Sequence, residues 1–181
     1  MTRHGWCCAP SHCNEHREGA TVTRTLILLR HAKSAWPEGI PDVQRPLSGR
    51  GRRDAPAAGR WLQEKFAKID LVLCSPAVRA AQTWDLASAQ LDAMPRVSYD
   101  DRLYGASTGE LLKIIQELPP KASTVVLVGH NPGLEDFLEL LTGAADALKT
   151  SAIAVMTTRV TWAKAKERSY TLEAFAIPRG E

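Results

Sequence analysis

Short, wholly apolar runs recur along this chain, and amphipathic stretches separate them. The clearest runs are residues 26–29, 71–74 and 125–128, in which no polar residue alternates with the apolar ones. A strand that is buried on both faces needs apolar side chains at every position, whereas a half-exposed strand alternates. Such strands between amphipathic helices are typical of a mainly parallel sheet with helices on both faces. We therefore expect a three-layer α/β/α fold.

The full set of predicted elements extends this pattern to about six strands. Strands are expected at residues 25–29, 69–74, 97–99, 124–128, 152–162 and 169–177. Helices are expected at about residues 48–66, 76–86, 111–118 and 132–141. The last two strands flank the charged residues 164–168, which is the pattern of a hairpin. This C-terminal hairpin should add at least one antiparallel strand to the sheet.

Residues at the helix ends support these boundaries. Ser48 can cap the first helix, although Pro56 must either kink that helix or move its start to about Asp54. Ser107 and the Glu three residues later have the spacing of a capping box before the third helix. Gly143 closes the fourth helix. These signals are independent of the apolar periodicity, and they agree with it.

The length of 181 residues suits one domain, which we place at residues 24–181. Residues 1–23 are predicted to be a disordered N-terminal tail. That tail carries Cys7, Cys8 and Cys13 together with three histidines, and these residue types are the usual zinc ligands. It has no clean C-x-x-C pair, which favours a tail without a metal. A third interpretation is that residues 1–21 do not belong to the natural protein, since they are so unlike the rest.

The charge and hydropathy patterns exclude several classes of protein. A formal net charge of +3 is too small for a dedicated nucleic-acid binder, which concentrates many more cations. No apolar run reaches the ~20 residues that a bilayer span needs. The N-terminus lacks the continuous apolar segment of a secretory signal. We therefore expect a cytoplasmic enzyme that binds neither nucleic acid nor a membrane.

Basic residues follow the three apolar runs. Arg30 and His31 come after the first run, Arg79 follows the second, and His130 follows the third. In open α/β sheets the carboxyl ends of the strands form the rim at which ligands bind. Two imidazoles and two guanidiniums at one rim indicate an anionic ligand, most simply a phosphoryl group.

These four residues suit phosphoryl transfer. His31 is the candidate nucleophile, because a neutral imidazole can attack phosphorus in line and carry the phosphoryl group covalently. Nearby guanidiniums disfavour the imidazolium, and a hydrogen bond from the other ring nitrogen to a backbone carbonyl would select the tautomer. Arg30 and Arg79 are candidate clamps for phosphate oxygens. His130 is expected to donate to an equatorial oxygen.

Side chains around this rim are further candidates. Lys33 and Ser34 follow the nucleophile closely and are expected to contact the phosphate. Trp36 and Tyr104 lie in loops that would line the mouth of the pocket. The densest basic stretch comprises Arg45, Arg50, Arg52, Arg53 and Arg60. This stretch is either a solvated face or a docking surface for an acidic partner protein, and the solvated face is favoured.

A cysteine nucleophile is the competing interpretation of one strand end. Cysteine-dependent tyrosine phosphatases need five residues between their thiolate and their arginine, whereas four separate Cys74 from Arg79. A cysteine at a buried strand end is more often inert packing. We therefore expect Cys74 to have no catalytic role.

Three motifs carry a family resemblance. Residues 29–32 (LRHA), 75–83 (SPAVRAAQT) and 128–132 (VGHNP) resemble the histidine phosphatase superfamily, which includes the phosphoglycerate mutases. Residues 45–48 (RPLS), followed by Gly51, also match the loop into the first helix of that family. The closer resemblance is to the short SixA-like branch, the phosphohistidine phosphatases. It implies that His31 is phosphorylated, that Arg30, Arg79 and His130 form the phosphate pocket, and that no metal or other cofactor is used.

The resemblance also implies a substrate. Larger members of the superfamily carry a glutamate general acid, and no matching motif is present here, although Asp100, Asp101 and Glu110 lie near the relevant stretch. An alkoxide leaving group profits greatly from such an acid, whereas an imidazole leaves without one. The expected substrate is a phosphohistidine on a protein, such as a phosphorelay component. The alternatives are a phosphatase of a small phosphate monoester and a catalytically silent binder of phosphate or phosphoprotein.

Overall fold

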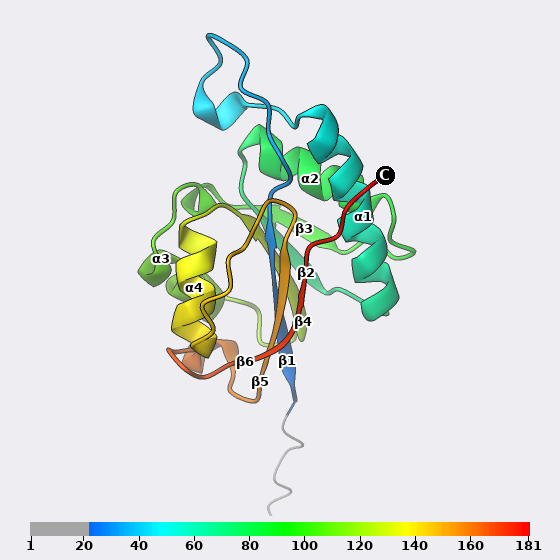
Figure 1. The fold of residues 1–181 in the computed structure, drawn as a ribbon. Coiled ribbons are helices and arrows are strands. Elements are labelled where there is room, and N and C mark those ends of the chain that lie inside the picture. Colours follow the sequence, from blue (N-terminus) through cyan, green and yellow to red (C-terminus); the bar gives the residue numbers. More distant parts are fainter. Residues whose placement is uncertain (1–21) are drawn as a thin grey trace, which may run out of the picture.

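A six-stranded sheet forms the middle layer of the structure, a computed structural model that describes residues 22–181 (Figure 1). The strands are β1 (Arg24–Arg30), β2 (Leu71–Cys74), β3 (Arg96–Tyr99), β4 (Thr124–Gly129), β5 (Ile153–Thr158) and β6 (Thr171–Ala176). Their spatial order is β3-β2-β4-β1-β5-β6. The first four strands are parallel, and β5 and β6 add an antiparallel pair. The predicted mainly parallel sheet with a C-terminal antiparallel addition is confirmed.

Helices cover both faces of the sheet (Figure 1). On one face lie α1 (Gly49–Lys65) and α2 (Val78–Ser88), and on the other lie α3 (Thr108–Gln116) and α4 (Gly133–Thr142). The continuous apolar run of β1 explains this arrangement. Leu26 and Leu28 pack in the core under α3 and α4, whereas Ile27 and Leu29 pack in the core under α1 and α2. Successive side chains of one strand therefore fill two separate cores.

The topology brings two strand ends together. β1 and β4 are neighbours with Arg30 paired opposite Gly129. The helix that follows β1 packs on one face of the sheet, and the helix that follows β4 packs on the other. Because the two connections leave in opposite directions, a crevice opens between the carboxyl ends of these strands. His31 and His130 are the residues that come directly after them.

One predicted strand is too long, one of the two predicted starts of the first helix is wrong, and the other boundaries agree to within three residues. The strand predicted at residues 152–162 ends at Thr158, because Trp162 begins a short 3-10 helix, where its buried indole Nε1 donates to the carbonyl of Ala122 (2.7 Å). The first helix begins after Ser48, whose hydroxyl accepts from a backbone N–H, so a start near Asp54 is wrong. Pro56 lies inside that helix at a partly exposed position, where water can satisfy the carbonyl that loses its N–H donor.

Two further expectations concern the N-terminal tail and membrane-spanning helices. The predicted tail and its cysteines lie, except for residues 22 and 23, outside the described residues. Within residues 22–181, no helix combines the length and the apolar character that crossing a membrane requires.

Candidate active site

The predicted site residues surround one cavity of about 330 Å³ at the carboxyl edge of the parallel strands. The six residues proposed to catalyse or to bind substrate line it, as does Trp36, whereas Tyr104, which was also expected at the mouth, is not among the lining residues. The lining residues are Arg30, His31, Lys33, Ser34, Trp36, Asp42, Arg45, Arg79, His130, Asn131 and Thr150. They come from the ends of β1 and β4, the first turn of α2, and the loops before α1 and β5. The fold therefore gathers side chains that are up to 120 residues apart in sequence.

His31 is held as one neutral tautomer. Its Nδ1 lies 2.7 Å from the carbonyl oxygen of Ala32, which can only accept, so Nδ1 carries the proton. On the other side of the ring, the Nε–H of Arg79 donates to Nε2 across 3.3 Å. Burial, followed by the charges of Arg79 and Arg30, lowers the pKa of His31 to about 4, although the Ala32 carbonyl opposes this. The Nε2 lone pair is therefore present at neutral pH.

The guanidinium of Arg79 uses every one of its nitrogens. Besides the contact with His31, it donates from one terminal nitrogen to the backbone carbonyl of Asp42 (2.6 Å) and from the other to the Asp42 carboxylate (2.9 Å). Asp42 lies in a 3-10 turn (Asp42–Gln44) of the loop between β1 and α1. The hydroxyl of Tyr104 also donates to this carboxylate (2.7 Å). Arg79 is thus clamped between the nucleophile and the rim of the cavity.

Arg45 belongs to the dense basic stretch, for which a solvated face is favoured over a docking surface, yet it lines the cavity. It is buried, with only 6% of its surface exposed. Its guanidinium donates to the Asp42 carboxylate (2.6 Å) and to the hydroxyl of Ser34 (2.6 Å), and it lies over the ring of Trp36. Its place in the RPLS motif, rather than its charge, is the sequence signal for this role.

The loop after β1 is anchored to the start of α1. The backbone N–H and the hydroxyl of Ser48 both donate to the carbonyl of Lys33 (2.8 and 2.9 Å). A Cβ added at Gly51 would lie 2.1 Å from that same oxygen, so only glycine permits this approach. The side chain of Lys33 is exposed at the cavity, whereas Ser34 is buried and occupied by Arg45.

The guanidinium of Arg30 is partly engaged by a backbone carbonyl. One terminal nitrogen donates to the carbonyl of Leu148 (2.7 Å), while its buried Nε has no hydrogen-bond partner within residues 22–181. Burial lowers the pKa of this guanidinium below its usual value. The remaining N–H donors of Arg30 can contact an anion in the cavity. One terminal nitrogen is already engaged, so Arg30 cannot offer all of its donors to that anion.

His130 lies beside the nucleophile with a ring-centroid separation of 5.0 Å. Its Nε2 is 2.8 Å from the hydroxyl of Ser75, a residue at the end of β2. Its Nδ1 is buried and lacks a hydrogen-bond partner in the described part of the chain. Burial and the neighbouring His31 lower the pKa of His130 to about 3. If the Ser75 hydroxyl donates to Nε2, the proton of the neutral ring resides on Nδ1 and is available to an anion.

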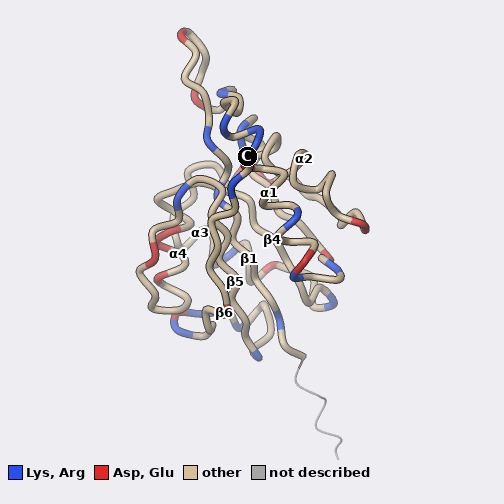
Figure 2. Tube along the Cα trace, turned by 45° about the vertical axis from the view of Figure 1, so that its right-hand side comes forward, with Lys and Arg blue, Asp and Glu red and all other residues tan. Residues whose placement is uncertain are grey.

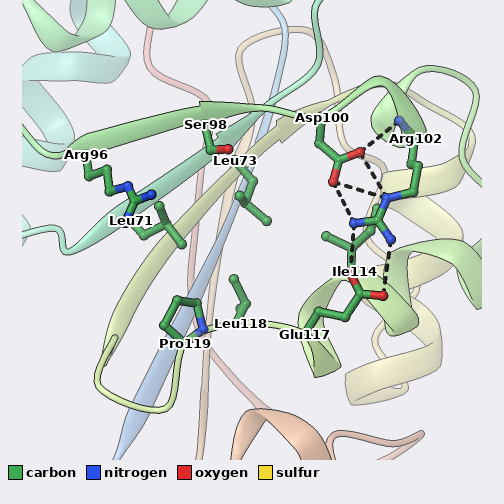
Figure 3. A pocket seen from close by; sticks show the side chains of 10 residues that line it. All are labelled: Leu71, Leu73, Arg96, Ser98, Asp100, Arg102, Ile114, Glu117, Leu118 and Pro119. Atoms are coloured by element: carbon green, nitrogen blue, oxygen red, sulfur yellow. Dashed lines mark hydrogen bonds and ion pairs between the residues drawn. The ribbon is translucent and has the colours of Figure 1, made fainter.

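The acidic residues that the sequence left as candidates lie elsewhere. Asp100 lines a second cavity of about 190 Å³ beside the edge strand β3 (Figure 3). There the guanidinium of Arg102 forms ion pairs with both Asp100 and Glu117. Glu110 accepts from the backbone and hydroxyl of Ser107 in the expected capping box. The side chain of Asp101 is exposed. None of these three carboxylates lines the cavity at His31.

Cys74 is buried at the end of β2, and burial raises the pKa of its thiol to about 12. A thiol of this kind is protonated at neutral pH and is a poor nucleophile. Within residues 22–181, no group of three His, Cys, Asp or Glu side chains is placed to hold a metal ion. The cavity at His31 is lined by two imidazoles and three guanidiniums, from His31, His130, Arg30, Arg45 and Arg79.

The fold and this arrangement agree with the comparison of the chain with known families. A sequence profile of the histidine phosphatase superfamily (branch 1) matches residues 26–118. The chain belongs to the histidine phosphatase superfamily. The matched residues include the loop after β1 and the first turn of α2, which supply His31 and Arg79.

Relatives and solved structures place the chain within this family. It is 39% identical over 162 residues to an uncharacterized protein of Mycobacterium tuberculosis, Rv1276c, covering 83% of this chain and all of the relative. A structure from Nakamurella multipartitia, assigned to the SixA phosphohistidine phosphatases, is similar with a TM-score of 0.77 and 32% identity over 86% of this chain and 96% of the other. A SixA-assigned structure from Agrobacterium tumefaciens has a TM-score of 0.74 and 29% identity over 86% and 98% of the two chains. The chain is therefore SixA-like in structure.

Proposed function

We propose that this protein is a phosphatase that works through a covalent phosphohistidine on His31, and that its substrate is a phosphohistidine on another protein. One observation carries the proposal. The proton of His31 is on Nδ1, bonded to the Ala32 carbonyl, so the lone pair of Nε2 is free of a proton and accepts from the Nε–H of Arg79 in a cavity that Arg30, Lys33 and Arg45 also line. An uncharged nucleophile among cations is what attack on an anionic phosphoryl group requires.

The reaction takes place in two displacements. The Nε2 lone pair forms a bond to phosphorus, and the bond between phosphorus and the substrate breaks with its electron pair moving to the leaving atom. A water molecule then attacks phosphorus, the phosphorus–Nε2 bond breaks, and the pair returns to Nε2 while the water loses a proton to solvent. Arg30, Arg79 and His130 would stabilise the charge on the equatorial oxygens in both steps. His31 ends as the same Nδ1–H tautomer.

Within residues 22–181, the cavity offers no un-ionised carboxylic acid as a proton donor, which supports a phosphorus–nitrogen substrate. Among the residues that line the cavity, Asp42 is the sole carboxylic acid. Hydrogen bonds from Tyr104 and Arg45 hold its pKa well below the usual range, so it is ionised at neutral pH and cannot protonate an alkoxide. An alkyl phosphate would lack general acid help here, whereas an imidazole can leave without it.

The surroundings of the cavity support a protein as the carrier of that phosphohistidine. The loop between β1 and α1 projects from the carboxyl edge of the sheet (Figure 1), and it exposes Trp36, Ile40 and Val43. Lys and Arg gather around the start of α1 beside this loop (Figure 2). Exposed apolar residues next to cations are typical of a protein-binding surface. The SixA-like structural relatives agree with this choice of substrate.

Trapping the intermediate tests the proposal. The protein is mixed with a protein phosphohistidine, quenched, and analysed for an acid-labile, base-stable phosphoryl group that peptide mapping assigns to His31. The His31→Ala variant should form none. A panel of phosphohistidine, phosphoserine and sugar phosphates, run with a chelator, should show the phosphohistidine turned over fastest. A silent binder would form no phosphoenzyme, and faster turnover of alkyl phosphates would identify a small-molecule phosphatase.

A further inference from the structure

Asp42 is a carboxylate at the rim of a cavity whose other charged side chains are basic. Its Oδ1 accepts from Arg45 (2.6 Å), and its Oδ2 accepts from Arg79 (2.9 Å) and from the hydroxyl of Tyr104 (2.7 Å). A carboxylate offers about four lone-pair positions. Three donors among the described residues therefore leave one position, on Oδ1. With 47% of the side chain exposed, a further donor can reach it from the opening of the cavity.

The reaction proposed above directs the leaving group toward this rim. In an in-line displacement, the attacking and leaving atoms lie on opposite sides of phosphorus. His31 is the buried member, with 8% of its surface exposed, whereas Asp42 and Tyr104 are on the exposed side. The lone pair of Nε2 is directed at the Nε–H of Arg79, and a terminal nitrogen of the same guanidinium donates to the Asp42 carboxylate. A leaving group opposite Nε2 would therefore depart on the side of the cavity where Asp42 lies.

The proton on a phosphorylated imidazole decides how that ring can leave. When the ring nitrogen that does not bear phosphorus carries a proton, the ring departs as neutral imidazole. When that nitrogen is bare, the ring must depart as an imidazolate, which is a far poorer leaving group. A negative hydrogen-bond acceptor at the bare nitrogen favours the protonated ring. No proton has to be transferred in the displacement itself.

We propose that Asp42 is a specificity-determining residue for phosphohistidine, an inference that rests on the function proposed above. Its carboxylate accepts the N–H of the substrate's phosphorylated imidazole. As Nε2 of His31 bonds to phosphorus, the phosphorus–nitrogen bond of the substrate breaks, its electron pair stays on that nitrogen, and the other nitrogen keeps its proton. Neutral imidazole then leaves from the rim.

The enzyme treats its own intermediate in the same way. Once His31 carries the phosphoryl group on Nε2, its Nδ1–H is still bonded to the Ala32 carbonyl. Water can then release phosphate with His31 departing as neutral imidazole. The Asp42 carboxylate accepts the N–H of the incoming phosphoimidazole, just as the Ala32 carbonyl accepts the N–H of the phosphorylated His31. An alkyl phosphate has no N–H to offer, and the dianion of such an ester is repelled by the same carboxylate.

Two small substrates distinguish a hydrogen bond between Asp42 and the leaving imidazole from a role in which Asp42 only positions Arg79. N-phosphorylimidazole has an imidazole leaving group, and p-nitrophenyl phosphate has an aryl leaving group that needs no proton. In Asp42→Asn, kcat/KM for N-phosphorylimidazole should fall roughly tenfold to a hundredfold, as for a lost hydrogen bond to a charged group. The loss of support for Arg79 should lower the value for p-nitrophenyl phosphate as well, but by at least fivefold less than the value for N-phosphorylimidazole, so the ratio of the two values reports the hydrogen bond to the leaving imidazole. The alkaline limb of the N-phosphorylimidazole profile should move to lower pH by about one unit or more, because the variant no longer favours the protonated ring.

Controls make the result decisive. Asp101→Asn removes an exposed carboxylate outside the cavity and should behave as wild type on both substrates. Thermal unfolding of Asp42→Asn checks that the loop variant is folded. Equal losses on the two substrates would mean that Asp42 only positions Arg79, which overturns this inference and leaves the proposed function standing. If wild type formed no phosphoenzyme on His31, the proposed function would fail, and this inference with it.

Discussion

The Nε–H of Arg79 donates to Nε2 of His31 across 3.3 Å, at the atom that is proposed to attack phosphorus. The same guanidinium holds the backbone carbonyl and the carboxylate of Asp42. Arg79 therefore aligns the imidazole and connects it to the loop at the rim. In the proposed mechanism this Nε–H must move from the lone pair to a phosphoryl oxygen when the substrate arrives.

Replacing Arg79 with lysine tests this double role. A lysine ammonium keeps the charge but has no rigid fork, so it cannot serve His31 and Asp42 together. We expect Arg79→Lys to lower kcat on p-nitrophenyl phosphate by about 10²–10³-fold, the usual cost of a lost transition-state donor. Arg60→Lys, at an exposed position of α1, is the matched control. Full activity of Arg79→Lys would show that only its charge matters.

The pH profile of kcat/KM should report the unusual state of His31. Its pKa is lowered to about 4 from an ordinary value of 6.5, so the neutral nucleophile persists well below neutrality. Activity should therefore fall only as the pH drops through about 4, where Nε2 becomes protonated. A profile on p-nitrophenyl phosphate, corrected for ionisation of the substrate, measures this limb. A limb near pH 6.5 would contradict the burial and charge environment seen here.

The same shifts make a prediction for stability. The folded protein resists protonating His31 and His130, whose pKa values are lowered to about 4 and about 3, while the unfolded chain binds those protons near pH 6.5. Between pH 6.5 and these lowered pKa values, the unfolded chain therefore binds more protons than the folded protein. The free energy of unfolding decreases as the pH falls through this window. The slope should be about 1.4 kcal/mol per pH unit for each histidine in that window. Urea unfolding of wild type and His31→Asn between pH 7 and pH 4 should show the smaller slope in the variant, and equal slopes would refute this.

The sequence predicted the strand ends better than the loops, for a physical reason. A strand that is buried on both faces leaves an unbroken apolar run, so the residue that ends it, such as His31 or His130, can be identified from sequence. Asp42 and Arg45 lie in a loop whose path depends on tertiary contacts, including the close approach of Gly51 to Lys33. Periodicity contains no information about such a path. The basic neighbours of Arg45 therefore favour a solvated face for this residue, whereas the structure buries it.

Ser75 gives a prediction that depends on a single proton. Its hydroxyl lies 2.8 Å from Nε2 of His130, and when it donates there, the proton of the neutral ring is on Nδ1, which has no hydrogen-bond partner among the described residues. Ser75→Ala removes that preference, so we expect kcat to fall roughly tenfold with little change in KM. Ser75→Thr keeps the hydroxyl and should recover most of the rate. If the alanine variant matched wild type, the tautomer of His130 would not depend on Ser75.

The projecting loop yields the prediction that separates protein substrates from small ones. A phosphohistidine side chain is short, so a protein that delivers its phosphorus to His31 must bring its own surface against the rim of the cavity. Ile40 and Val43 are exposed there, by 43% and 37%, and neither lines the cavity. The double variant Ile40→Ser, Val43→Ser should lower kcat/KM on a phosphohistidine protein by about tenfold, through lost apolar contact. Turnover of N-phosphorylimidazole should remain within twofold of wild type.

Met94 provides the control for that variant. It is 70% exposed in the connection between α2 and β3, and it is absent from the cavity lining. Met94→Ser removes a comparable exposed apolar side chain and should leave the rates on both substrates unchanged. The loop variant alters only contacts with the protein that carries the phosphohistidine. Its defect should therefore appear in KM for the protein substrate and not in the rate at which bound substrate phosphorylates His31. Equal losses on the protein and on N-phosphorylimidazole would mean that the loop supports the catalytic site and does not dock a partner.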